Sequence, residues 1–213
     1  MAPARPGRRR SGFSRDPEPV KRSRLKALQH DLIVIGGGIN GTGIARDAAL
    51  RGLNTCLVEQ ADLCNSTTRW SSRLIHGGLR YLEFGELGLV HESLQERGRL
   101  LRNAAHLVRP LQLFIPVYAH SRRGINTVDF GLWVYDLLSI GGGLPGHRRL
   151  SRDAALVELP ALNPEGLDGG ILYHDAQVTF VERLVVENAL AASAAGAIIR
   201  TRTTVERIVL EGN

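Results

Sequence analysis

The chain has 213 residues, enough to bury a sizeable core in one or two domains. Its 27 basic and 21 acidic residues give a net charge of +6, but residues 1–30 hold nine of the basic residues and two of the acidic ones. The remaining body carries 18 basic and 19 acidic residues, and this near-neutral balance argues against nucleic-acid binding by the folded part. The sequence has no apolar run of about 18 residues, which excludes a membrane-spanning helix.

Residues 1–30 form a basic tail rich in Pro, Gly, Ser and Arg, and we expect this tail to be disordered. Three roles stay open for it: a solvated extension, a segment attracted to anionic lipid, or an organelle-targeting peptide. No aromatic side chain is interleaved with the basic residues between positions 14 and 30, so we expect no nucleic-acid partner.

A strand, a helix and a second strand are predicted next. The apolar run over residues 32–35 indicates a buried parallel strand, the helix follows over residues 42–51, and the second strand covers residues 55–58. A glycine-rich turn joins the first strand to the helix. We expect five residues of this turn to bind a cofactor: Gly36, Gly37, Gly38, Asn40 and Gly41.

The chemistry of this unit is that of a dinucleotide site. Gly36 permits the tight turn, Gly38 lets the backbone approach a pyrophosphate, and Gly41 lets the helix pack against the strand. The amino end of the helix attracts the diphosphate, and Glu59 at the end of the second strand would accept hydrogen bonds from the ribose hydroxyls. The unit predicts an adenine dinucleotide; the alternative is a glycine-rich turn in another α/β protein.

Hydroxyl side chains are frequent in the segment that follows, where Ser66, Thr67, Thr68, Ser71 and Ser72 could bind a cofactor phosphate. The pair Gly77–Gly78 would let a flat ring approach the backbone closely. Cys56 is expected to be buried in the second strand and Cys64 lies in the next loop. Their spacing includes no C-x-x-C and no His at ligand distance, so we expect neither a metal site nor a disulfide.

Two stretches carry a resemblance to a known family. Residues 35–52 read IGGGINGTGIARDAALRG, and residues 72–83 read SRLIHGGLRYLE. Both resemble amino-terminal blocks of the FAD-dependent (aerobic-type) glycerol-3-phosphate dehydrogenases, and the resemblance runs from about residue 31 to the end of the chain. Two departures stand out, because Arg73 replaces the usual Lys and Arg69–Trp70 occupy positions where small residues are common.

The resemblance implies FAD as the cofactor. Among the hydroxyls and glycines of the segment after Glu59, we expect Thr67, Ser71, Ser72, Gly77 and Gly78 to contact it. It also implies a substrate side with three candidate catalytic residues: Arg80, Tyr81 and His76. Arg80 would bind the substrate phosphate or stabilise charge on a reduced flavin, Tyr81 would donate a hydrogen bond, and His76 would serve as the base.

The rest of the chain alternates between helical and extended patterns. We expect a helix over residues 86–108, a strand over 111–118, an apolar segment over 126–140, a short helix from Ser151 to Pro160, a strand over 171–178, a helix over 181–195 and one or two strands over 197–210. The apolar segment includes Phe130, Trp133 and Tyr135. Core packing is expected for it, and a membrane-facing patch is the alternative.

The fold class predicted from these elements is α/β, a Rossmann-like FAD-binding domain with part of an inserted α+β substrate domain. Residues 31–110 would form the FAD-binding part, residues 111–178 the start of the substrate or cap domain, and residues 179–213 a return segment toward the FAD domain. Because members of the resembling family are more than twice this long, we expect the chain to be an amino-terminal fragment.

The resemblance also implies an activity, namely the oxidation of sn-glycerol 3-phosphate to dihydroxyacetone phosphate with FAD, which then passes electrons to a quinone. Two alternatives stay open: a related FAD-dependent amino- or hydroxy-acid oxidase, and an inactive FAD-binding fragment. The expected location is the cytoplasm, with peripheral contact to the inner membrane as an option.

Overall fold

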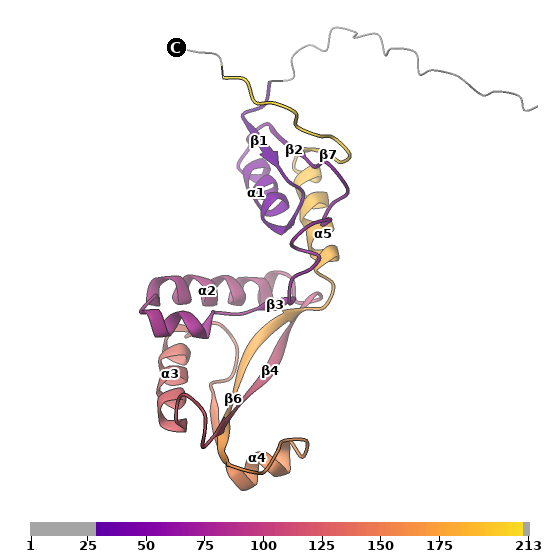
Figure 1. Ribbon diagram of the computed structural model, residues 1–213. Helices are drawn as coiled ribbons and strands as arrows, with labels where there is room; N and C mark the ends of the chain where they lie inside the picture. The colour runs from indigo at the N-terminus through magenta and orange to yellow at the C-terminus, as the bar shows by residue number, and fades with distance from the viewer. Residues whose placement is uncertain (1–28, 211–213) are drawn as a thin grey trace, which may run out of the picture.

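The computed structural model describes residues 29–210, and most of the tail for which disorder is expected, residues 1–28, lies outside that range. The described chain forms two lobes, each built around its own sheet (Figure 1). The first lobe contains β1 (Leu32–Ile35), α1 (Ile39–Leu50), β2 (Thr55–Val58), α5 (Val181–Ala194) and β7 (Ile198–Arg200). The second contains β3 (Leu74–Ile75), the 3₁₀ helix η1 (Leu79–Phe84), α2 (Leu87–Asn103), β4 (Val108–Tyr118), α3 (Ile125–Leu138), β5 (Arg148–Ser151), α4 (Arg152–Glu158) and β6 (Leu167–Val178).

The first lobe is a three-stranded parallel sheet in the order β1-β2-β7, with α1 and α5 packed against each other. The predicted strands over residues 32–35 and 55–58 are confirmed at both ends. Ala45 and Ala192 are fully buried where the two helices meet the sheet residues Val34 and Leu57. Small side chains at this contact let the helices approach closely, so one face of the sheet is covered by a tightly packed layer of helices.

The second lobe is organised around β6. The long strand β4 pairs antiparallel with β6 along its whole length, while β3 and β5 pair with opposite ends of its other edge. The helices α2 and α3 pack on this sheet through a core that includes Val90, Leu94, Leu132 and Ile171. The last predicted strand region, residues 197–210, contains only the short strand β7.

Only one side of α3 belongs to the core. Leu132 and Tyr135 are buried, but Phe130, Trp133 and Leu137 are exposed by 68%, 58% and 52%. The expectation of core packing was therefore wrong for Phe130 and Trp133, because α3 lies at the surface of the lobe and touches its neighbours with one face. No helix among residues 29–210 has the length and apolar character needed to cross a membrane.

The chain passes between the lobes twice, and Arg73 joins the two crossings. Its guanidinium donates to the carbonyl oxygen of Thr179 at 2.6 Å and to the Glu182 carboxylate at 2.9 Å. The backbone N–H of Val178 donates to the carbonyl oxygen of Arg73 at 3.0 Å. The two terminal nitrogens of the guanidinium fork each bind one of these acceptors. Arg73 therefore contacts both crossings at the junction between the lobes.

The change of lobe falls near residue 73, earlier than the boundary expected at residue 110. β3 pairs with β6 in the second sheet, and α2 packs on α3 and on the same sheet. Residues 74–110 therefore belong structurally with residues 111–178, while α5 and β7 bring the chain back to the first lobe. Nothing in the amphipathic pattern of α2 shows which of the two sheets it will cover.

A charged pair lies inside the second lobe. Arg97 of α2 and Asp175 of β6 are each 1% exposed, and the guanidinium Nη1 lies 2.5 Å from the Asp175 carboxylate. The Tyr135 hydroxyl donates to the same carboxylate at 2.8 Å. Burial, together with the negative charge of Asp175 and this hydrogen bond, raises the pKa of the Tyr135 hydroxyl well above its ordinary value of 10.

This raised pKa predicts a loss of stability at alkaline pH. The folded state holds the Tyr135 proton more tightly than the unfolded state, so the contribution of Tyr135 is intact below pH 10 and is lost as the pH rises toward the folded-state pKa. Denaturant unfolding of the wild type and of Tyr135→Phe should show a stability difference that is constant below pH 10 and shrinks above it. A stability difference that stays constant above pH 10 as well would contradict the raised pKa assigned to Tyr135.

Candidate functional site

The turn between β1 and α1 is shaped by glycine. Gly36 has a φ of +113°, a backbone conformation that residues with a side chain rarely adopt. Its N–H donates to the carbonyl oxygen of Val58 at 2.8 Å. A Cβ on Gly41 would overlap the carbonyl oxygen of Gly36. The helix can start this close to the strand only because Gly41 has no side chain. Asn40, also predicted to bind the cofactor, is exposed in the first turn of α1.

The amino end of α1 suits an anion. Gly38, the N-cap residue, has no side chain of its own to cap the helix, and the first turn contains no acidic residue. The hydroxyl oxygen of Thr68 accepts a hydrogen bond from the Ile39 N–H at 3.2 Å, so the loop after β2 crosses this end of the helix. The first N–H groups of a helix lack intrahelical partners and carry partial positive charge, which suits a phosphate group.

Glu59 lies beside the same turn. One oxygen of its carboxylate accepts from the Gly37 N–H at 2.7 Å, and the other accepts from the Ala61 N–H at 2.9 Å. A Cβ on Gly37 would come within 3.0 Å of the Glu59 Cβ and 2.8 Å of a Leu63 methyl carbon. The carboxylate is therefore held at the carboxyl end of β2 in a fixed position next to the glycine turn, where a ribose would meet it.

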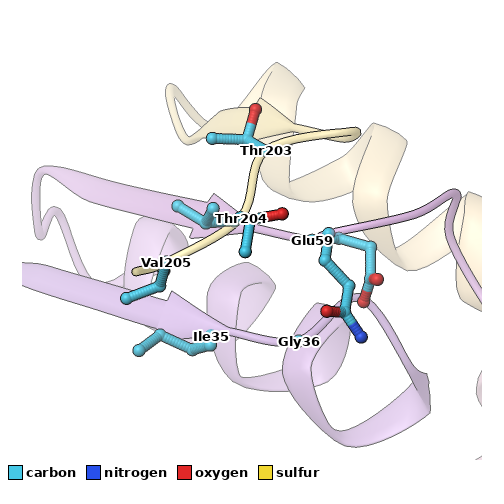
Figure 2. A pocket seen from close by; sticks show the side chains of 8 residues that line it. Ile35, Gly36, Glu59, Thr203, Thr204 and Val205 are labelled. Carbon is cyan, nitrogen blue, oxygen red and sulfur yellow. The ribbon is translucent and has the colours of Figure 1, made fainter. Parts of the chain in front are cut away.

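A pocket of about 210 Å³ opens at the carboxyl ends of β1 and β2. Figure 2 shows Ile35, Gly36 and Glu59 on one side of this pocket and Thr203, Thr204 and Val205 on the other. The segment that follows β7 reaches this position because the Arg202 N–H donates to the Ala61 carbonyl oxygen at 2.8 Å. The Thr203 N–H likewise donates to the carbonyl oxygen of Glu59 at 2.9 Å.

The family of FAD-dependent oxidoreductases has a sequence model that matches residues 31–213. The chain belongs to this family. FAD is the family's cofactor, which confirms the cofactor and the fold class predicted from the sequence.

Two named relatives and one solved structure are informative. The chain is 53% identical over 173 residues to a glycerol-3-phosphate dehydrogenase of Synechocystis sp., covering 81% of this chain and 31% of the relative. It is 44% identical over 180 residues to glycerol-3-phosphate dehydrogenase 1 of Mycobacterium tuberculosis, covering 80% and 34%. The glycerol-3-phosphate dehydrogenase from Bacillus halodurans complexed with FAD superposes with a TM-score of 0.63 at 28% identity, covering 88% of this chain and 29% of that one.

The chain spans about a third of the length of the curated relatives that it matches. Within that third, the first lobe fits the ADP half of FAD. The amino end of α1 would hold the pyrophosphate, Glu59 would accept from the ribose hydroxyls, and the pocket beside Val205 would receive the adenine.

The structure brings only part of the predicted site together. Gly36, Gly37, Gly38, Asn40, Gly41 and Glu59 surround one corner of the first lobe. Thr67, Ser71 and Ser72 are exposed in the loop between the lobes. The segment from His76 to Tyr81 belongs to the second lobe, where Gly77 and Gly78 are buried and His76, Arg80 and Tyr81 are exposed. Contact of any of these residues with a cofactor or substrate stays a prediction.

The sequence did not predict every residue that lies beside the glycine turn. The sequence predicts Thr68 only as one of five hydroxyls that could bind a cofactor phosphate, and of these five it is the one that bonds to α1. No sequence pattern near residues 203–205 indicates that they line this pocket, because pairing of β7 with β2 brings them beside Glu59. Cys56 and Cys64 are buried and unpaired, and no cluster of three or more His, Cys, Asp or Glu side chains within residues 29–210 is placed to hold a metal ion.

Two glycines of α1 provide a matched test of the turn. In Gly41→Ala the new methyl group overlaps the Gly36 carbonyl, so we expect a loss of about 1–3 kcal/mol in unfolding free energy and at least a tenfold loss in FAD affinity. In Gly43→Ala the methyl group meets no atom within 4 Å, so FAD affinity should be unchanged and stability equal or higher. Denaturant unfolding and flavin fluorescence titration measure both quantities; equal losses in the two variants would contradict the interpretation.

Proposed function

We propose that this chain forms the dinucleotide-binding part and the beginning of the substrate side of a flavin-dependent glycerol-3-phosphate dehydrogenase. The observation that carries the proposal is the 53% identity over 173 residues to a protein of that name. The glycine turn, the amino end of α1 and Glu59, here called the dinucleotide corner, lie within the aligned residues and agree with it, as does the sequence block over residues 72–83. The reaction would be the oxidation of sn-glycerol 3-phosphate to dihydroxyacetone phosphate.

The residues of this chain would bind and orient the substrate. When bound, FAD supplies the redox chemistry by accepting the hydride that leaves C2 of the substrate. Arg80 is exposed, with its guanidinium carbon 5.9 Å from the centre of the Tyr81 ring, so both side chains are accessible to a ligand. The guanidinium would bind the phosphate through two parallel hydrogen bonds, the Tyr81 hydroxyl would donate a hydrogen bond, and His76 would accept the proton of the C2 hydroxyl.

The alternative of an amino- or hydroxy-acid oxidase has weaker support. Such enzymes share the first βαβ unit and the fold, whereas the relatives that are 44–53% identical to this chain carry the name glycerol-3-phosphate dehydrogenase. Since relatives of this identity usually keep the residues that bind substrate, we favour the phosphorylated alcohol over an amino acid. The spectroscopic experiment below tests the remaining alternative, that the chain binds FAD but has no activity.

Anaerobic spectroscopy tests the proposal. The purified chain, reconstituted with FAD, should show flavin absorbance bands that bleach on addition of glycerol 3-phosphate and not of glycine or lactate. Arg80→Gln should weaken the response to glycerol 3-phosphate at least tenfold, because the phosphate loses its charged partner. Arg122→Gln, which removes an exposed arginine from the loop after β4, should not. Bleaching by an amino or hydroxy acid would favour the oxidase, and bound flavin that ignores every substrate would favour the inactive fragment.

We also infer that electrons leave toward a quinone at a membrane surface. Phe130, Trp133 and Leu137 form an exposed apolar stripe along α3. Beside this stripe, an open groove of about 670 Å³ is lined by apolar residues of η1 and α3 and by the ion pair of Glu83 with Arg123. An apolar patch of this kind on a surface helix suits contact with lipid and with an apolar electron carrier.

Vesicle co-sedimentation tests the membrane contact. Zwitterionic phosphatidylcholine vesicles should be used, because they give the basic residues of the tail no anionic partner. Trp133→Ser should lower the bound fraction severalfold, while Trp70→Ser, which removes an 80% exposed tryptophan from the loop between the lobes, should leave it unchanged. Equal binding of all three proteins would contradict a role for α3.

A further inference from the structure

Three buried polar side chains from three different elements meet inside the second lobe. They are Arg97 of α2, Tyr135 of α3 and Asp175 of β6, and none is more than 2% exposed. One carboxylate oxygen of Asp175 accepts from the Arg97 guanidinium at 2.5 Å and from the Tyr135 hydroxyl at 2.8 Å. Arg97 also donates to the carbonyl oxygen of His174 at 3.2 Å. The cluster fixes the tyrosine hydroxyl, because its proton must point to Asp175 and its oxygen is left as an acceptor.

The remaining acceptor of the Tyr135 hydroxyl is used by a backbone group. The Gly77 N–H donates to the Tyr135 oxygen at 2.7 Å. A Cβ on Gly77 would overlap the Leu94 side chain and lie 2.7 Å from the same oxygen, so the turn fits against the network only as glycine. Gly78 continues the turn with a φ of +72°. Gly77 thus has a packing reason to be glycine in addition to the predicted approach of a flat ring.

Stability alone does not account for this arrangement. Removing a charged pair from water costs more than its attraction commonly returns, and apolar side chains of similar volume would often serve the core equally well. The Arg97 Nε has no hydrogen-bond partner within the described part of the chain, so the buried guanidinium is not fully satisfied. What the charged pair does provide is a single orientation for the Tyr135 hydroxyl, and through it a single position for the Gly77 amide.

We propose that Tyr135, oriented by Asp175 and Arg97, is a positioning residue that fixes the turn of His76–Gly78. This inference rests on the proposed function, because the turn carries His76 on one side and Arg80 with Tyr81 on the other, the residues assigned to the substrate. The Tyr135 hydroxyl, held by the Asp175 carboxylate, keeps the backbone at Gly77 in one geometry. Small displacements of reacting groups cost large factors in rate, so such a hold affects catalysis more than folding.

Amide hydrogen exchange of the whole chain is the first test, since it needs neither FAD nor substrate. In Tyr135→Phe the Gly77 N–H loses its acceptor, and its exchange should accelerate about tenfold or more relative to the amides of the β4–β6 ladder, which report opening of the lobe. The matched control is Tyr173→Phe, which removes a hydroxyl from the ring that packs edge-on against Tyr135. Gly77 exchange in the control should stay at the wild-type value.

A second measurement separates positioning from a structural role. In the FAD-loaded chain, Tyr135→Phe should slow the limiting rate of flavin reduction by glycerol 3-phosphate about tenfold, with FAD affinity within about twofold of wild type. Gly77 exchange that rises only in parallel with the ladder amides, or that rises equally in Tyr173→Phe, would overturn the proposal. If the wild-type chain is not reduced by the substrate, the proposed function fails, and the exchange experiment still decides whether Tyr135 holds the turn.

Discussion

The contact of Arg73 with the return crossing is the interaction on which the two-lobe arrangement depends. The second lobe is inserted between β2 and α5. Its position relative to the first lobe is therefore set where the outgoing segment near residue 73 meets the returning segment near residue 179. Arg73 binds the Thr179 carbonyl and the Glu182 carboxylate at this point. The Arg73–Glu182 pair is partly exposed and is worth about 1 kcal/mol or less. Its importance is geometric, because it ties together the two points at which the chain crosses between the lobes.

The dinucleotide corner is built almost entirely from backbone. Gly36, Gly38 and Gly41 expose the chain at the turn, and Glu59 is held by two backbone N–H groups. A phosphate carries negative charge that N–H groups at a helix end can meet without any basic side chain. This explains how a first lobe with few charged residues near its turn can still bind an anionic cofactor.

The second lobe uses the opposite strategy. In its interior, a buried arginine and a buried tyrosine both donate hydrogen bonds to one carboxylate oxygen of a buried aspartate. Such a group is costly to desolvate and strict in geometry. Three elements far apart in the chain must all be in place before the network is satisfied, so the lobe that carries the predicted substrate residues is also the one with the most narrowly specified core.

The βαβ unit, its glycine turn, Glu59 and the family could all be predicted from the sequence, because each depends on residues close together in the chain. Three features depend on contacts between distant parts of the chain and could not be predicted. Residues 74–110 joined the second lobe because β3 found its partner in β6. Thr203 to Val205 line the pocket beside Glu59 because β7 pairs with β2. The burial of Arg97 could not be predicted from the amphipathic pattern of α2, because the sequence does not distinguish a buried arginine from a solvated one. Only the folded chain places Asp175 beside it.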